Sequence, residues 1–233
     1  ESAARRVGEM VDEGADWIDV GGESTRPGSQ PVPAGEQIRR VLPAIRSAVE
    51  RDVVVSIDTT QSAVAEAALD AGASIVNDIS AGRDDPAMLP LVARRGAAVV
   101  LMHMQGTPAT MQLDPRYEDV VGEVLEFLRV RRDAAERSGV PRERILLDPG
   151  IGFGKTTEHN LRLMRDLRRF RELGQPLLVG TSRKRFIGEI TDRPDPADRL
   201  LGTAATVSWA ITNGAAVVRV HDVSAMRQVL RMT

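Results

Sequence analysis

Short apolar runs recur along the chain, and each is followed by a longer stretch in which apolar residues repeat every three or four positions. The runs are rich in β-branched residues and are continuous rather than alternating, which is typical of strands covered on both faces of a parallel sheet. They predict seven strands, at Asp16–Val20, Val53–Ile57, Ser74–Val76, Ala97–Met102, Ile145–Leu147, Leu177–Val179 and Ala216–Val220.

The longer stretches are amphipathic and predict helices between the strands. This alternation indicates right-handed crossovers and a parallel sheet. A chain of 233 residues suits one α/β barrel of the (β/α)8 TIM-barrel class, or one large open sheet. The predicted helices are Ser2–Glu13, Gln37–Glu50, Ser62–Ala71, Pro86–Arg95, Tyr117–Ser138, Glu158–Glu172, Asp198–Thr212 and Val223–Leu230.

The pattern begins and ends on a helix, so it holds eight helices but seven strands. A closed barrel needs one more strand. We expect that strand and its loop to lie before Glu1, and an open sheet is the alternative. No linker, low-complexity tract or block of charge divides the chain, so we expect residues 1–233 to form a single domain.

The composition argues against nucleic acid and membrane as partners of this protein. The 31 basic and 33 acidic residues nearly balance, and aromatic residues make up 3% of the chain. Without a basic stretch interleaved with aromatics, nucleic acid is not an expected partner. No run approaches the roughly 18 apolar residues of a membrane span, so no membrane association is expected. Cysteine is absent, which excludes thiolate catalysis and is compatible with the cytoplasmic location that we expect.

Lysine is rare among the basic residues. Lys155 and Lys184 are the two lysines, and the other 29 basic residues are arginines. A coding bias toward arginine is the simple explanation. Under such a bias, a position that remains lysine is a candidate for a compact ammonium that a planar guanidinium cannot replace.

Polar residues follow every predicted strand. In parallel barrels, ligands bind on the loops after the strands. Helix capping would explain one or two polar strand ends, but not seven in succession. We therefore expect a rim that binds a small polar ligand. In chain order its residues are Glu23, Ser24, Thr25, Arg26, Asp58, Asn77, His103, Asp148, Lys184, Arg219 and His221.

The glycine-rich segment at residues 148–155 fails two phosphate-binding patterns. A Walker loop would need a glycine where Pro149 stands, and a dinucleotide fingerprint would need one at Lys155. Neither a nucleoside triphosphate nor NAD is supported. We expect a flexible turn that lets the backbone and the Phe153 ring lie close to a flat ligand.

The rim residues divide by chemistry into two groups. Asp58, Asn77, Asp148 and Lys184 offer donors and acceptors that suit a nitrogen-rich ring, because a carboxylate can accept two parallel N–H bonds from an amide or guanidine edge. Arg26, Arg219 and His221 offer positive or switchable charge that suits a phosphate. Taken singly, Arg219 could be a surface ion pair and His221 an ordinary rim histidine.

At these residues the chain resembles the dihydropteroate synthase family of pterin-binding TIM barrels. The resemblance runs through the whole chain in the family's order. Pterin-binding methyltransferases that work with a corrinoid protein would not be expected to carry the STRPG, SRK and RVHD strings together. The matching strings are GGESTRPG (21–28), SIDTT (56–60), VNDISA (76–81), LMHMQGTP (101–108), DPGIGFGK (148–155), TSRKRFIG (181–188) and RVHDV (219–223).

The resemblance implies a folate-pathway transferase. It would join 6-hydroxymethyl-7,8-dihydropterin diphosphate to 4-aminobenzoate, giving 7,8-dihydropteroate and diphosphate, and sulfonamides would compete with aminobenzoate. The family also implies Mg²⁺ and a homodimer paired through the last helices. The alternatives are a non-catalytic paralogue that binds pterin and, less favoured, a pterin-dependent methyltransferase.

The resemblance also implies roles for particular residues. The pterin would be bound by Asp58, Asn77, Met104, Asp148, Gly180 and Lys184, among which Asp58, Asp148 and Lys184 would be catalytic. The diphosphate would be bound by Thr25, Arg26, Arg219, Val220 and His221. Aminobenzoate would be bound by Thr25, Arg26, Pro27, Phe153, Lys184 and Arg185. No metal ligand is expected within this chain, because the family's ligand ends the strand expected before Glu1.

Overall fold

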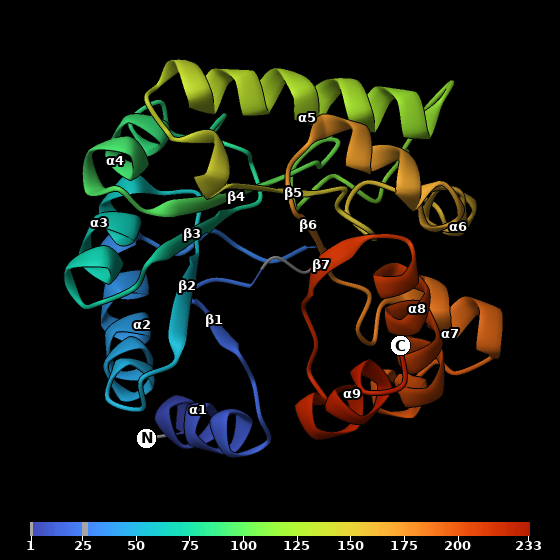
Figure 1. Cartoon of the computed structure of the whole chain (residues 1–233), viewed down its shortest axis with the longest axis horizontal. Coiled ribbons are helices and arrows are strands. Elements are labelled where there is room, and N and C mark those ends of the chain that lie inside the picture. The colour runs from blue at the N-terminus through green and yellow to red at the C-terminus, as the bar shows by residue number, and fades with distance from the viewer. Residues whose placement is uncertain (1, 25–27) are drawn as a thin grey trace.

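The computed structural model describes residues 2–24 and 28–233. Its seven strands form one parallel sheet in chain order, which confirms the predicted α/β class and all seven strand positions. The sheet curls around a central axis, with the helices outside it (Figure 1). The strands are β1 (Trp17–Gly21), β2 (Val54–Asp58), β3 (Ile75–Asp78), β4 (Ala98–Met102), β5 (Ile145–Asp148), β6 (Leu177–Val179) and β7 (Ala215–Val218).

The described part of the chain holds nine α-helices, one more than predicted. They are α1 (Ser2–Asp12), α2 (Ala34–Val49), α3 (Ser62–Asp70), α4 (Met88–Arg95), α5 (Val120–Arg137), α6 (Thr157–Arg165), α7 (Arg185–Thr191), α8 (Leu200–Thr212) and α9 (Val223–Leu230). Three 3₁₀ segments complete the list: η1 (Arg142–Arg144), η2 (Leu167–Leu173) and η3 (Pro196–Arg199). Among the residues that the structure describes, no helix combines the length and the apolar character of a membrane-spanning segment.

Helix α7 is the element that the sequence pattern missed. It has seven residues and contains Gly188, so it shows little periodicity. Burial of Phe186 and Ile187 holds it against the core. The predicted helix Glu158–Glu172 also differs, since it splits into α6 and η2. Leu167, Phe170 and Leu173 are all buried along η2, and their three-residue spacing is the period of a 3₁₀ helix.

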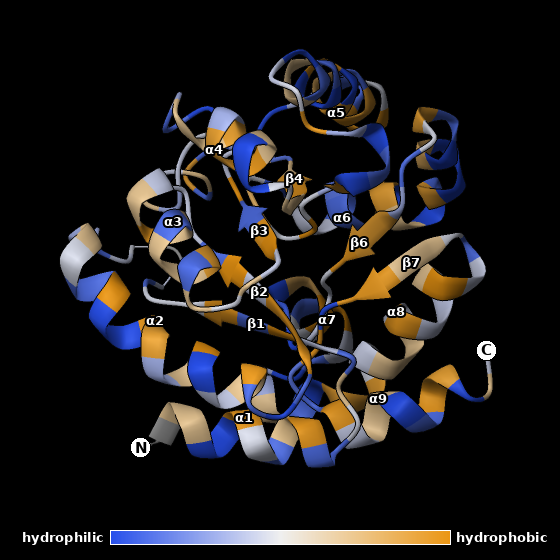
Figure 2. Ribbon diagram, turned by 60° about the vertical axis from the view of Figure 1, so that its left-hand side comes forward, coloured by the Kyte–Doolittle hydropathy of each residue, from blue (hydrophilic) through white to orange (hydrophobic). Residues whose placement is uncertain are grey.

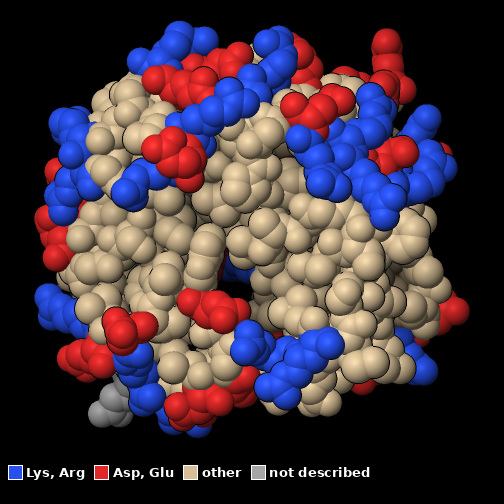
Figure 3. Space-filling model, viewed as in Figure 1, with Lys and Arg blue, Asp and Glu red and all other residues tan. Residues whose placement is uncertain are grey.

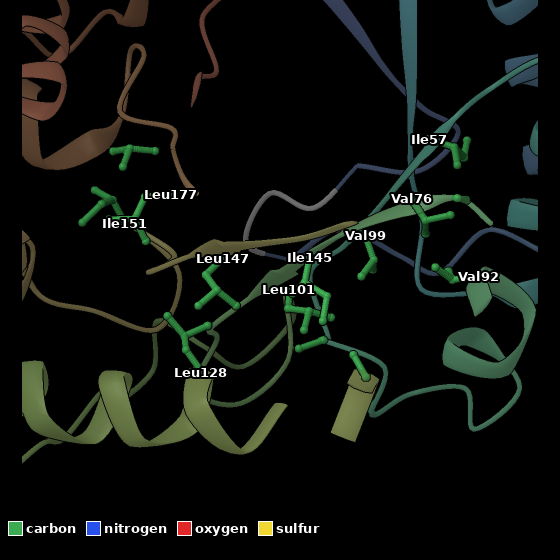
Figure 4. Close-up of a cluster of buried hydrophobic side chains, with 14 of the residues drawn as sticks. Ile57, Val76, Val92, Val99, Leu101, Leu128, Ile145, Leu147, Ile151 and Leu177 are labelled. Atoms are coloured by element: carbon green, nitrogen blue, oxygen red, sulfur yellow. The ribbon is translucent and has the colours of Figure 1, made fainter. Parts of the chain in front are cut away.

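Side chains alternate between the two faces of the curled sheet. Residues such as Val76, Val99 and Leu101 point outward into the main core beneath the helices, and Figure 4 shows them grouped with Leu128 of α5. A smaller cluster fills the inside of the curl and is made of Ile75, Val100, Leu146 and Leu178. The strands therefore carry apolar residues on both faces, and their ribbons are mostly orange in Figure 2, which explains the continuous apolar runs.

The sheet stays open between β1 and β7. These strands are the two ends of the strand order, and a groove of about 530 Å³ lies between them, bounded also by α1 and α9. In the space-filling view a hollow opens at this place (Figure 3). An open edge at this point is consistent with the eighth strand that is expected from the helix count.

Candidate active site

The carboxyl ends of β2, β3 and β5 bring together three of the predicted ring-binding residues. Asp58 and Asn77 are direct partners in the β2–β3 register, so their side chains stand next to each other. Asp148 ends β5. Asn77 and Asp148 are buried, and the Asp58 side chain is 14% exposed. The structure thus places polar groups inside the curl, above the apolar cluster that fills it.

Burial disfavours ionisation of the carboxyl groups of Asp58 and Asp148. It raises the pKa of Asp58 to about 7, with repulsion from Asp19 as the next cause and the charge of Arg219 opposing it. Burial likewise raises the pKa of Asp148, while the Lys184 ammonium and an N–H bond oppose the shift. That bond runs from the Gly150 N–H to Asp148 Oδ1, over 2.7 Å. A cationic or N–H-rich ligand would supply the partners that these carboxylates lack.

Asp19 is a member of this site that the sequence analysis did not single out. Its Oδ2 accepts from Arg219 Nε at 2.6 Å and from Asn77 Nδ2 at 3.3 Å. It thereby links the ring-binding group to the cationic group. In the sequence it is marked by a carboxylate inside an apolar run, whereas the predicted site residues follow the ends of the strands.

The predicted diphosphate residues Arg219, Val220 and His221 follow β7 directly. Arg219 Nη2 lies 3.7 Å from Asp58 Oδ2, and the charge of Asp19 is the main cause that raises the pKa of Arg219. Val220 and His221 line the groove beside β7. Arg219, which follows β7, therefore borders the ring-binding carboxylate of Asp58.

The loops after β6 and β7 are tied to each other. The backbone N–H of His221 donates to Ser182 Oγ at 3.1 Å, and the His221 Nδ1 lies 2.9 Å from the same oxygen. Arg183 forms an ion pair with Asp222, with Nε at 2.9 Å from Oδ2. These contacts hold the SRK and RVHD segments in a fixed relation.

Lys184 stands between the ring-binding carboxylates and the glycine turn. Its Nζ donates to Ile151 O and lies 4.7 Å from the centroid of the Phe153 ring. Burial lowers its pKa to about 8, although the charge of Asp148 opposes that shift. Gly180 borders the same space, because a β-carbon there would lie 3.9 Å from Lys184 Nζ.

An apolar wall adjoins these polar groups. Met104 and Phe153 pack together with Ile79, Met102 and Met111 in a cluster separate from the main core. Met104 is fully enclosed and Phe153 is partly exposed. A flat aromatic ligand could therefore lie against Phe153 while its polar edge meets the carboxylates.

The glycine turn packs closely against a neighbouring loop. Gly150 and Gly154 both have a left-handed backbone, with φ of 67° and 61°. A β-carbon on Gly150 would lie 1.9 Å from His103 O, and one on Gly154 would lie 2.5 Å from Gln105 O. The turn is therefore pressed against the loop after β4, and glycine is needed for contact as well as for conformation.

The remaining predicted site residues are not placed in the site by the structure. Arg185 is exposed, and its guanidinium pairs with Glu189 one turn along α7, so its role toward aminobenzoate stays a prediction. Thr25, Arg26 and Pro27 lie outside the described residues. Among the residues that the structure describes, no group of three or more His, Asp or Glu could hold a metal ion.

Comparison with known proteins assigns the class first. A family model described as pterin binding enzyme matches residues 1–221. The curled parallel sheet and its polar strand ends thus define a pterin-binding enzyme on an α/β barrel. A dihydropteroate synthase from Synechocystis is 48% identical over 232 residues, covering 99% of this chain and 80% of that protein. The chain belongs to the dihydropteroate synthase family.

Solved structures agree with this assignment. Dihydropteroate synthase from Xanthomonas albilineans with 4-aminobenzoic acid matches with a TM-score of 0.94 and 45% identity, covering 99% of this chain and 82% of that one. The same enzyme in complex with 7,8-dihydropteroate matches with a TM-score of 0.90 and 42% identity, over 100% and 83%. The Yersinia pestis enzyme in a sulfonamide complex matches with a TM-score of 0.94 and 37% identity, over 98% and 82%.

Proposed function

We propose that this protein condenses 6-hydroxymethyl-7,8-dihydropterin diphosphate with 4-aminobenzoate, giving 7,8-dihydropteroate and diphosphate. The observation that carries the proposal is the convergence of Asp58, Asn77, Asp148 and Lys184 beside Arg219. The similar enzymes solved with 4-aminobenzoic acid and with 7,8-dihydropteroate support the same pair of reactants. A pterin-binding paralogue without activity, or a methyltransferase, has no comparable support.

The pterin ring would lie across the strand ends. Asp58 and Asp148 would accept N–H bonds from its amide and guanidine edges, and Asn77 would complete the set. The Lys184 ammonium would donate to a ring acceptor, while Met104 and Gly180 would leave room for a flat ring. Since burial raises the pKa of both carboxyl groups, the ligand's N–H donors would stabilise their ionised forms.

The diphosphate and the aminobenzoate would meet on either side of the pterin methylene. Arg219, Val220 and His221 would bind the diphosphate, joined by Thr25 and Arg26. Phe153, Lys184 and Arg185 would face aminobenzoate, together with Thr25, Arg26 and Pro27. The position of Phe153 beside Lys184 and of Arg219 beside Asp58 supports this division.

The chemistry needs electrostatic stabilisation more than a strong base. As the C–O bond to diphosphate breaks, its electrons leave with the diphosphate and a delocalised cation remains on the pterin methylene. Asp58 and Asp148 would stabilise that cation, and Arg219 would stabilise the departing anion. The aryl amine then attacks the methylene carbon and loses a proton to solvent.

Mg²⁺ remains part of the proposal as an ion that would neutralise the diphosphate. The described residues do not form a site for it, so no step above depends on it. Its protein ligand would come from a strand in the open groove between β1 and β7.

A homodimer in the cytoplasm completes the proposal. Leu201 is 84% exposed and Trp209 is 50% exposed on α8, with Ile190 of α7 also exposed. Figure 3 shows few charged side chains over α7 and α8. Large exposed apolar patches mark interfaces in soluble proteins, so Leu201→Glu should convert a dimer into a monomer in sedimentation analysis, and an unchanged dimer would contradict this assignment.

Inhibition kinetics test the proposed function. A sulfonamide should raise the apparent KM for 4-aminobenzoate and leave the maximal rate unchanged, because it would occupy the pocket beside Phe153. The absence of inhibition, or competition against the pterin substrate instead, would contradict the assignment of that pocket.

A further inference from the structure

Each of the five consecutive carbonyl groups from Gly150 to Gly154 accepts a side-chain hydrogen bond. The Gly152 carbonyl accepts from Gln112 at 2.8 Å, and the Gly154 carbonyl accepts from the Tyr117 hydroxyl at 2.7 Å. Lys184 donates to the carbonyl of Ile151. The remaining two carbonyls, of Gly150 and Phe153, accept from Lys155 at 3.0 and 2.9 Å. A segment with three glycines is thus held at every carbonyl.

Lys155 is the buried centre of this arrangement. It is 3% exposed, and its Nζ also lies 2.9 Å from His103 Nδ1, on the loop after β4. Three N–H donors of an ammonium therefore meet three acceptors, with His103 accepting in the tautomer protonated at Nε2. No carboxylate within the described residues is hydrogen-bonded to this ammonium. Lys155 therefore binds backbone carbonyl groups rather than forming an ion pair.

The two carbonyls that Lys155 holds belong to residues beside the proposed substrates. The Gly150 N–H donates to Asp148 Oδ1, so Gly150 is held through both its N–H and its carbonyl. Phe153 presents its ring next to Lys184. A shift of either residue would move a group assigned to pterin or aminobenzoate.

We infer that Lys155 is a positioning residue for the condensation, which fixes the Phe153 ring and the Asp148 carboxylate by holding the carbonyls of Phe153 and Gly150. The inference rests on the proposed function, because that function assigns Asp148 and Phe153 to the substrates. Lys155 itself is assigned to neither substrate.

The shape of the pocket explains why this position remains lysine in a chain with 29 arginines. The three acceptors surround one nitrogen at similar distances. A compact ammonium satisfies such a set, whereas a planar guanidinium spreads five N–H groups over a wider fork. Lys155→Arg should therefore fail to rescue the function of the lysine.

The test is a double-mutant cycle between Lys155→Met and Phe153→Ala in the intact natural protein, measured at pH 6, where the buried Lys155 keeps its proton. Lys155→Met should raise the KM for 4-aminobenzoate by about tenfold or more, because a small misplacement of a positioning group costs much catalysis. When Lys155→Met is added to the Phe153→Ala variant, the KM of that variant for 4-aminobenzoate should change little. The reason is that Lys155 acts on this KM through Phe153. Lys155→Arg should resemble Lys155→Met.

Ile45→Val is the matched control. Ile45 is fully buried on α2, is assigned to neither substrate, and loses one buried methyl group in this change. It should lower the unfolding temperature and leave both KM values unchanged. If Lys155→Met also lowers only the unfolding temperature, or if its effect adds fully to that of Phe153→Ala, the inference is overturned.

Two further results are decisive. If Lys155→Met does not fold, Lys155→Gln, which keeps two N–H donors, enters the same cycle; if neither folds, Lys155 serves folding and the inference fails. If the wild-type protein itself forms no product from both substrates, the proposed function has failed. In that case the affinity for 4-aminobenzoate is measured for each variant of the cycle. This affinity tests the role of Lys155 independently of the proposed reaction.

Discussion

Arg219 Nε lies 2.6 Å from Asp19 Oδ2, so an ion pair joins the end of β7 to β1 across the open side of the sheet. The pair connects the cation assigned to diphosphate with a carboxylate that also raises the pKa of Asp58. Asp19 therefore influences both halves of the site, although no role was assigned to it from sequence.

Asp19→Asn should shift the pH dependence of pterin binding to lower pH. Burial and Asp19 raise the pKa of Asp58 from 3.8 to about 7, so protonation weakens its acceptance of N–H bonds as the pH falls below about 7. Removing the charge of Asp19 lowers the pKa of Asp58. It also frees Arg219 from its ion pair with Asp19, so that Arg219 can favour the ionised form of Asp58. Calorimetric titration with a pterin between pH 5 and pH 9 measures the shift.

Asp16→Asn is the control for this prediction. Asp16 is 77% exposed and pairs with Arg227 on α9, so its loss should leave the profile in place. A profile that Asp19→Asn leaves unchanged, or moves to higher pH, would show that Asp19 does not set the pKa of Asp58.

Lys184→Arg should remove most activity even though the charge is kept. The Lys184 ammonium fits between Ile151 O and the Phe153 ring, a space that a guanidinium cannot enter without displacing them. We expect kcat/KM to fall by roughly a hundredfold in steady-state kinetics. The exposed Arg46→Lys on α2 serves as a control that should change nothing, and near-native turnover by Lys184→Arg would refute the assigned role.

Gly150→Ala should destabilise the protein far more than Gly96→Ala. Both glycines have left-handed backbones, but a β-carbon on Gly150 would lie 1.9 Å from His103 O, whereas one on Gly96 has nothing within 4 Å. Gly96→Ala isolates the conformational cost, on the order of 1 kcal/mol. Urea unfolding should give a loss several times larger for Gly150→Ala, and equal losses would contradict the close packing of the two loops.

Much of this molecule was predictable from sequence. The continuous apolar runs marked all seven strands, because strands covered on both faces carry little polar alternation. Asp58, Asn77 and Asp148 could be placed at one rim because parallel strands end at the same edge. The matching strings then divided that rim between two substrates.

What escaped prediction depended on tertiary contacts. Helix α7 is stabilised by burial of Phe186 and Ile187 rather than by its own periodicity. The pairing of Lys155 with His103 joins two loops that are 52 residues apart, and no local pattern signals such a contact. Asp19 lies inside an apolar run, and its side-chain hydrogen bonds to Asn77 and Arg219 come from strands far apart in the sequence.

Lys155 should also contribute to the pH dependence of the free energy of unfolding. Burial lowers its pKa from 10.5 to about 7, with Lys184 adding to the shift and Asp148 opposing it. Between these values the unfolded chain binds more protons than the folded one, so the free energy of unfolding rises with pH, on the order of 1 kcal/mol per pH unit. His103, held neutral by a pKa lowered to about 2, does not titrate in this window.

Lys155→Met removes this contribution. In urea unfolding, the stability of the wild type relative to Lys155→Met should therefore increase between pH 7 and pH 9. A difference that stays constant over this range would mean that Lys155 is charged in the folded protein at all these pH values.

The assignment as a synthase is tested by the release of diphosphate by the intact natural protein, measured with each substrate alone and with both together. We predict that release requires both 6-hydroxymethyl-7,8-dihydropterin diphosphate and 4-aminobenzoate, and that one 7,8-dihydropteroate forms for each diphosphate. Pterin binding without release of diphosphate in the presence of both substrates would contradict the assignment as a synthase.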